Sequence, residues 1–270
     1  MCFAVFSCVC AGIVVLLILM TSMRKKIHYR LIGYTGISIM ILQVSFMIQG
    51  NEGTSLCNIQ GYVNISATIS CLVWACILSY NLYVEILFEQ ELSEKYYWVI
   101  GYLLPALIPM PELVMGKYSE KMSWCMMKKD LYGNYMMIFE FFVPFIASWF
   151  FNITIVLRIK QYLKEFDSGF RTEEFLSKKK TFKAFRCHPA WVNALFVLPA
   201  VYQFYYLQHS VSSRTIDILG MIGETLIGYG FGLMFLLNFF TRGDMKKVVF
   251  SEKFPSVITI ETSLSVNAES

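Results

Sequence analysis

Four glutamates lie inside or at the edge of long apolar stretches of this 270-residue sequence: Glu85, Glu112, Glu140 and Glu224. A carboxyl group among apolar side chains is costly unless it meets a cation, a hydrogen-bond donor or water. Such groups are therefore candidates for binding a ligand or a proton, or for holding two packed elements together.

Glu85 follows Asn81 at a spacing of four, which places both side chains on one face of a helix. Tyr83 lies between them. The pattern predicts a polar lock at the inner end of this helix. In it, the side chains of Asn81, Tyr83 and Glu85 contact basic residues of another helix, such as Lys183 or Arg186. The alternative is that Glu85 only reaches interfacial water.

Glu140 falls near the outer end of a second stretch, and Glu224 lies about two turns into a third. With Tyr202 and Tyr205 they predict a pocket for an extracellular ligand. Two carboxyl groups suit a cationic or polar neutral ligand, because an anion needs basic groups or several donors. A purely structural carboxyl at Glu224 is the alternative.

Enzymatic chemistry is not indicated. The three histidines, His28, His188 and His209, are scattered rather than convergent, which argues against a metal site. The sequence has no phosphate-binding glycine loop and no nucleophile elbow. We expect no enzyme activity, no cofactor and no nucleic-acid partner.

The elements that must position these residues are membrane helices. The composition is 56% hydrophobic with a mean hydropathy of +0.54, above the level of soluble proteins. Seven apolar runs approach the roughly 20 residues that cross a bilayer. They cover residues 3–22, 31–49, 58–88, 98–116, 136–157, 188–207 and 216–241. The predicted fold class is an all-α bundle of seven transmembrane helices, residues 1–241.

The basic residues assign the two sides of the membrane, since cytoplasmic loops carry more Lys and Arg. Most of the 23 share one side, including the loop from Arg158 to Arg186. Five lie on the other side: Lys117, Lys121, Lys128, Lys129 and Arg214. The N-terminus is therefore predicted outside and the C-terminus in the cytoplasm, in a multi-pass protein of the plasma membrane.

The segment 242–270 predicts two cytoplasmic features. Asp244 to Lys253 places apolar residues at helical spacing with flanking lysines, as in a short amphipathic helix on the inner leaflet. Residues 256–270 are polar and rich in Ser and Thr, which indicates a disordered tail. With the basic loop, the helix predicts contact with anionic lipids of the bilayer.

The eight cysteines divide by the same assignment of sides. Six lie in apolar helices or at the cytoplasmic boundary, where thiols stay reduced. Cys57 and Cys125 lie outside and are predicted to form a disulfide that fixes the loop 117–135 over the bundle. Two free thiols are the alternative.

Several short motifs accompany this arrangement: Cys57-Asn-Ile-Gln-Gly61, Trp74-x-Cys76-Ile77, Asn81-Leu82-Tyr83, His188-Pro189 and Gly228-Tyr-Gly-Phe-Gly232. Together with seven helices and the outer cysteine pair, they resemble G-protein-coupled receptors of the cyclic-AMP-receptor-like family (class E), which borders the secretin-like class. The Asp-Arg-Tyr and Asn-Pro-x-x-Tyr motifs of rhodopsin-like receptors are missing. The resemblance implies a receptor that binds a small extracellular ligand and activates a heterotrimeric G protein.

The expected mechanism is that ligand binding parts the helices at 136–157 and 188–207 on their inner side. Kinks at Pro144, Pro189 and Pro199 make two packings available. The G protein then contacts the inner segment from Arg158 to Arg186. A transporter or a non-signalling seven-helix protein is the alternative, because glycine and proline interrupt two of the helices.

Overall fold

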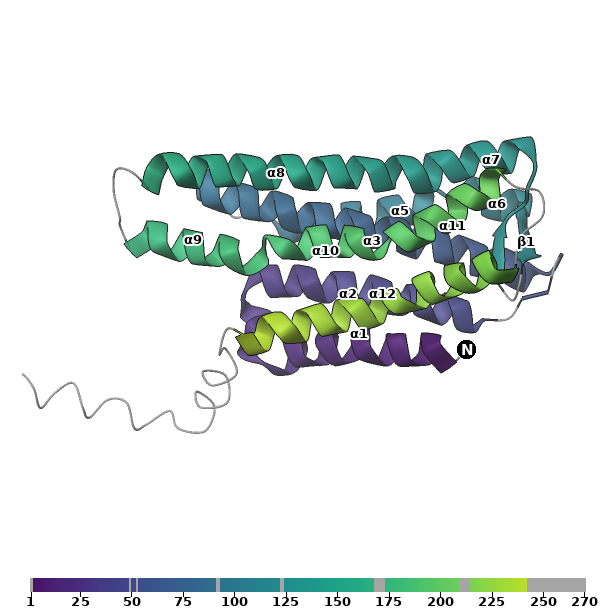
Figure 1. Ribbon diagram of the computed structural model, residues 1–270, viewed down its shortest axis with the longest axis horizontal. Coiled ribbons are helices and arrows are strands. Elements are labelled where there is room, and N and C mark those ends of the chain that lie inside the picture. The colour runs from purple at the N-terminus through teal and green to yellow at the C-terminus, as the bar shows by residue number, and fades with distance from the viewer. Residues whose placement is uncertain are drawn as a thin grey trace, which may run out of the picture.

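The computed structural model is a bundle of long helices with a small β-hairpin at one end (Figure 1). The structure describes residues 2–48, 50–51, 53–90, 93–121, 124–167, 173–208 and 214–241. Within these ranges, seven helical segments are long and apolar enough to cross a membrane, which confirms the predicted all-α seven-helix fold. We call them spans one to seven in chain order. The predicted amphipathic helix and tail at 242–270 lie outside the described residues.

Four spans are single helices, and three are divided into consecutive pieces. The single helices are α1 (Cys2–Met20), α2 (Ile27–Met47), α3 (Ser55–Phe88) and α12 (Arg214–Thr241), with the short η1 (Ser22–Lys25) between the first two. Span four consists of α4 (Glu94–Trp98), η2 (Val99–Leu103), α5 (Leu104–Leu107) and α6 (Met110–Met115). Span five consists of α7 (Leu131–Met137), η3 (Ile138–Phe142) and α8 (Val143–Asp167). Span six consists of α9 (Glu173–Phe185), α10 (Cys187–Leu195) and α11 (Val197–Gln208).

Prolines account for most of these divisions. The elements η2 and η3 are π-helical turns, and Pro105 and Pro144 each follow two residues after such a turn. Proline has no N–H and clashes with the preceding turn, so a locally wider turn accommodates it. In span six, both breaks fall three residues before a proline, Pro189 and Pro199.

Spans five and six extend further into the cytoplasm than predicted. The helix α8 continues to Asp167, where the prediction ended at residue 157, and α9 begins at Glu173, well before the predicted start at residue 188. Both project past the inner end of α2 (Figure 1). Hydropathy identifies only the part of a helix inside the bilayer. Beyond it, Leu163 and Phe175 are still buried in the main core cluster and support the helices in water.

Span three occupies the middle of the bundle. The helix α3 packs against α2, α8 and α10, whereas α1 lies outside and packs against α2 and α12. Trp74, near the midpoint of α3, is fully buried and contacts the rings of Tyr34 and Tyr102. Because α3 runs through the centre, its side chains reach both the outer and the inner face.

Candidate functional site

The β-hairpin covers the outer end of the bundle (Figure 1). Its strands β1 (Tyr118–Lys121) and β2 (Trp124–Met127) pair antiparallel. The predicted disulfide is confirmed: Cys57 of α3 is bonded to Cys125 of β2. The Cys125 N–H also donates to Gln60 Oε1 at 3.2 Å. The hairpin is thus attached to span three by covalent and hydrogen bonds.

Charged side chains connect the segment after the hairpin to its neighbours. Lys129 Nζ donates to the Tyr206 carbonyl of α11 at 2.9 Å, and Lys117 Nζ lies 3.4 Å from Asp130 Oδ2. Asp130 caps α7 by accepting the Gly133 N–H at 2.6 Å. This hydrogen bond, with the nearby charge of Lys117, holds the pKa of Asp130 below its usual value.

Beneath the hairpin, a small cavity lies between spans three, five, six and seven; we call it the outer cavity. Met126 and Met127 of β2 line its hairpin side. Glu140 of η3, Gln203 of α11 and Glu224 of α12 supply polar groups to its lining. The remaining lining residues are Gly61, Asn64, Ile65, Thr68, Cys125, Met137 and Phe141.

The unfilled hydrogen-bonding groups of the outer cavity are acceptors. Glu140 is only 1% exposed, and both of its carboxylate oxygens lack a hydrogen-bond partner among the described residues. The same holds for Gln203 Oε1. The lining contains two carboxyl groups and no Lys or Arg. A bound molecule that satisfies these groups therefore has to bring donors.

A second buried carboxyl group, that of Glu112 in α6, lies beside Glu140; we call them the carboxyl pair. Tyr132 donates its hydroxyl to Glu112 Oε1 at 2.8 Å, and Glu112 Oε2 has no partner in the described chain. The buried hydroxyl of Tyr118 in β1 also lacks a partner. Burial and these two carboxyl groups raise the pKa of Tyr118 above its usual value.

A polar network links spans three, five and six in the middle of the bundle. Ser79 of α3 donates to Asn152 Oδ1 of α8 at 2.6 Å, and Asn152 Nδ2 donates to Ser148 Oγ at 3.2 Å. Ser148 Oγ in turn donates to Asn193 Oδ1 of α10 at 2.9 Å. All four side chains are buried, and Asn193 Nδ2 is left without a partner among the described residues. On each of these three spans, the residues of the network lie between the residues that line the outer cavity and the inner end of the span.

At the inner end, four polar side chains from spans two, three and four form what we call the inner polar cluster: His28, Asn81, Glu85 and Tyr97. His28 Nε2 lies 2.7 Å from Glu85 Oε2, and His28 Nδ1 lies 3.2 Å from Asn81 Nδ2. The amide nitrogen of Asn81 is a donor, so Nδ1 accepts and Nε2 carries the proton that faces Glu85. Tyr97 completes the cluster by donating to Asn81 Oδ1 at 3.1 Å.

Span six contacts this cluster through aromatic packing and a salt bridge. The Phe185 ring of α9 lies 4.9 Å from the His28 ring and 5.2 Å from the Tyr29 ring, between centroids. At the surface, Lys178 Nζ of α9 lies 2.5 Å from Oε1 of Glu89, the residue that ends α3. Span six is therefore joined at the inner face to span two by ring packing and to span three by a salt bridge.

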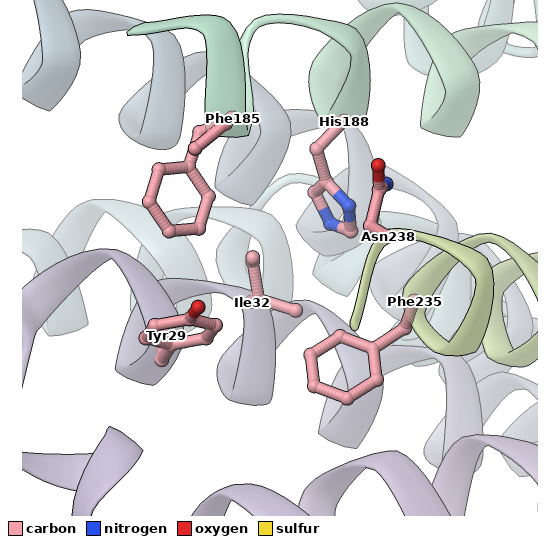
Figure 2. A pocket seen from close by; sticks show the side chains of 7 residues that line it. Tyr29, Ile32, Phe185, His188, Phe235 and Asn238 are labelled. Carbon is pink, nitrogen blue, oxygen red and sulfur yellow. The ribbon is translucent and has the colours of Figure 1, made fainter. Parts of the chain in front are cut away.

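A second, inner cavity lies between α2, span six and α12 (Figure 2). Figure 2 shows Tyr29 and Ile32 on one side, with Phe185 and His188 above them and Phe235 and Asn238 facing them. His188 is buried, with Nδ1 3.1 Å from Met234 Sδ and its ring against Phe231. The cavity thus lies between α12 and Phe185, the residue of span six that packs on the inner polar cluster.

The structure brings some of the sequence-predicted residues together. Glu140 and Glu224 line one cavity, whereas Tyr202 and Tyr205 are not among its lining residues. Tyr202 is instead buried in a cluster with the disulfide and the hairpin.

The predicted inner residues are also only partly brought together. Asn81 and Glu85 share the inner polar cluster, while Tyr83 packs its ring on Phe88. In the described chain, no salt bridge joins Glu85 to the basic residues expected beside it. Lys183 is exposed, Arg186 lies over the Phe182 ring, and Arg158 is exposed on α8.

Sequence reasoning missed His28 as the partner of Glu85. The predicted partners of Glu85 are the fixed positive charges of Lys183 and Arg186, and His28 enters the prediction only as a possible metal ligand. The available signal was its position: the start of the second helix and the end of the third share the inner side. As for metals, the described ranges contain no group of three or more His, Cys, Asp or Glu side chains placed to hold an ion.

Comparison with known proteins agrees with this geometry. The family profile described as "Slime mold cyclic AMP receptor" matches residues 1–169. Comparison with curated proteins gave no match. Among solved structures, squid rhodopsin has a similar fold, with a TM-score of 0.69 and 13% identity over 95% of this chain and 83% of that one. At this identity the likeness supports the seven-helix fold alone.

The family match covers more than half of the chain. The matched residues include the outer disulfide, the inner polar cluster and the carboxyl pair. The protein therefore belongs to the slime mold cyclic AMP receptor family, and it is a multi-pass membrane receptor of the G-protein-coupled type.

Proposed function

We propose that this receptor binds a small extracellular ligand in the outer cavity and activates a heterotrimeric G protein through its inner face. The observation that carries the proposal is the way span six is held at the inner end. Phe185 packs on His28, and Lys178 pairs with Glu89, so these contacts can break without disrupting any helix. Their release lets the inner end of span six move away from spans two and three.

The polar network in the middle of the bundle supports coupling between the two ends. It joins spans three, five and six, which are three of the four spans that line the outer cavity. Asn193 Nδ2 lacks a partner in the described chain, so the network is not fully hydrogen-bonded in this packing. A ligand shifts the equilibrium by its differential affinity for the two packings.

The inner surface offers a cationic docking face for the G protein. Arg158 and Lys160 are exposed on α8, and Lys179, Lys180 and Lys183 are exposed on α9. These helices extend past the rest of the bundle (Figure 1). Such a face attracts an acidic partner and the anionic lipids of the inner leaflet.

For the ligand, we propose a small molecule that brings hydrogen-bond donors or a positive charge. The family name refers to cyclic AMP, an anion that needs basic groups or several donors around its phosphate. Glu140 and Glu224 line the outer cavity without Lys or Arg, and Lys117 and Lys129 have other partners, Asp130 and the Tyr206 carbonyl. We therefore do not propose cyclic AMP as the ligand of this protein.

The experiment is a G-protein dissociation assay in cells that express the full chain, scanned across reporters for each Gα class. We compare the wild type with Glu85→Gln, which keeps the shape of the side chain and removes the charge that meets His28. Asp130→Asn, the same kind of change at the outer end, is the matched control.

We expect basal activation in at least one class, a several-fold increase with Glu85→Gln, and no increase with Asp130→Asn. Silence of both the wild type and Glu85→Gln in every class, with protein at the cell surface, contradicts G-protein coupling. Cyclic AMP added outside is expected to change nothing. A saturable response to it would contradict the ligand proposal and leave G-protein coupling standing.

A further inference from the structure

The carboxyl pair is the most unusual polar feature of the outer half. Glu112 comes from α6 in span four and is 0% exposed, and Glu140 comes from η3 in span five. Two ionised carboxylates side by side at this depth repel each other, with little water to screen them. The arrangement therefore requires a positive charge between them.

Protein donors do not fill this need. Tyr132 donates to Glu112 Oε1, while Glu112 Oε2 and both oxygens of Glu140 have no donor among the described residues. Of the other charged groups nearby, Lys117 pairs with Asp130, and Glu224 is a further carboxyl group in the lining of the outer cavity. In the described chain, no Lys or Arg forms a salt bridge with the pair.

Tyr118 is an independent indication of a bound species. Its side chain is 1% exposed, its hydroxyl has no partner in the described chain, and the two carboxyl groups are near enough to act on it electrostatically. The position of the ring is fixed, because a Cβ at Gly61 would stand 2.3 Å from Tyr118 Cδ1. Tyr62, the titratable neighbour on α3, donates its hydroxyl to the Ala106 carbonyl. Four oxygens without hydrogen-bond partners among the described residues, from three elements, thus belong to groups that lie close enough to interact.

We propose that Glu112 and Glu140 share one monovalent cation from the outer solution, a sodium ion or a proton, together with the hydroxyl of Tyr118. Hard oxygen ligands suit such a cation. A protein cage for Ca²⁺ supplies six or more oxygens, and the described residues contain no cluster of three carboxylates here.

The bound cation joins span four, span five and the hairpin at one point. Its loss leaves two like charges in contact and pushes the side chain of Tyr118, and with it β1, away from the carboxyl pair. The cation therefore keeps the hairpin closed over the outer cavity. The cation site shares Glu140 with the outer cavity, and its test uses neither the ligand nor G-protein coupling.

The test is thermal unfolding of the purified full chain in lipid nanodiscs, in sodium chloride or N-methyl-D-glucamine chloride at equal ionic strength, at pH 5.5 and pH 8.5. If sodium is the cation, the wild type at pH 8.5 melts about 3–5 °C higher in sodium. If the proton is the cation, sodium has no effect, and the wild type melts higher at pH 5.5. The sign follows because the folded state holds a proton that the unfolded state releases, so stability falls as pH rises.

The decisive variant is Glu140→Gln, whose amide can donate to Glu112 without a cation. If sodium is the cation, the melting temperature of this variant is expected not to depend on sodium. If the proton is the cation, the difference in melting temperature between pH 5.5 and pH 8.5 is expected to be smaller than in the wild type. Glu173→Gln, the same substitution at an exposed position of α9, is expected to keep the wild-type response. Tyr118→Phe removes a single hydroxyl and is expected to reduce the response. Equal responses of the wild type, Glu140→Gln and Tyr118→Phe in both arms would overturn the proposal.

Discussion

The two ends of the bundle are held together by different kinds of contact. At the outer end, the Cys57–Cys125 disulfide and a hydrogen bond from the Cys125 N–H to the Gln60 side chain fix the hairpin to span three. At the inner end, span six meets span three through the Lys178–Glu89 salt bridge and span two through the packing of Phe185 on His28.

The difference in strength indicates which end moves. A disulfide that closes a long loop contributes about 2–4 kcal/mol, whereas an exposed ion pair contributes about 0–1 kcal/mol. The outer end is therefore built to keep the shape of a cavity, and the inner end is built to separate.

Loss of the disulfide is expected to have the largest effect on this contrast. Replacing Cys57 by Ser should lower the free energy of unfolding by about 2–4 kcal/mol and reduce surface expression, because the hairpin loses its attachment to α3. Thermal melting and surface labelling measure the two effects. Cys2→Ser, at an exposed free cysteine, is the control. Normal melting and expression of Cys57→Ser would show that the outer end is not held covalently.

Crowding the hairpin is expected to have an intermediate effect. Gly61→Ala places a methyl group 2.3 Å from Tyr118 Cδ1, and either the ring or α3 has to shift. We expect a loss of about 1–3 kcal/mol. The control is Gly12→Ala, where the nearest atom is Met40 Cε at 3.6 Å. If both variants melt alike, the hairpin does not pack as tightly on span three as this account requires.

The Lys117–Asp130 ion pair tests whether an exposed ion pair at the outer end contributes as little to stability as an exposed one at the inner end. The lowered pKa of Asp130 means that its contribution is present at neutral pH and is lost as pH falls through that low pKa. Asn also caps helices, so Asp130→Asn should keep the cap and shift the melting temperature by only about 1 °C at pH 7. Melting curves from pH 7 to pH 3 should fall less steeply for the variant. A steeper fall would contradict the assignment.

The framework was predictable from the sequence because its causes are local or compositional. Apolar runs gave the seven spans, the distribution of Lys and Arg gave the sides, and only Cys57 and Cys125 then faced an oxidising compartment. The convergence of Glu140 and Glu224 also followed, since both lie near the outer ends of spans that face the bundle interior.

The contacts within the sites were not predictable, because they depend on helix rotation and on kinks. Nothing in the spacing of His28 and Asn81, 53 residues apart, shows that α2 and α3 bring them together. The carboxyl pair depends on a π-helical turn at η3 and on a hairpin that places Tyr118 beside it. The prediction of Lys183 or Arg186 beside Glu85 rested on charge alone, whereas the geometry of the bundle supplied an imidazole.

The most direct test of the central claim, that the inner face opens by parting spans three and six, is a charge exchange across the Lys178–Glu89 salt bridge. Basal G-protein activation is measured for Lys178→Glu, Glu89→Lys and the double variant at matched surface expression. Lys180→Glu, on the exposed side of the same helix, is the control. We predict that each single variant raises basal activation about two- to five-fold, and that the double variant returns it to the wild-type level. A double variant as active as the single ones, or single variants that match Lys180→Glu, would contradict the claim.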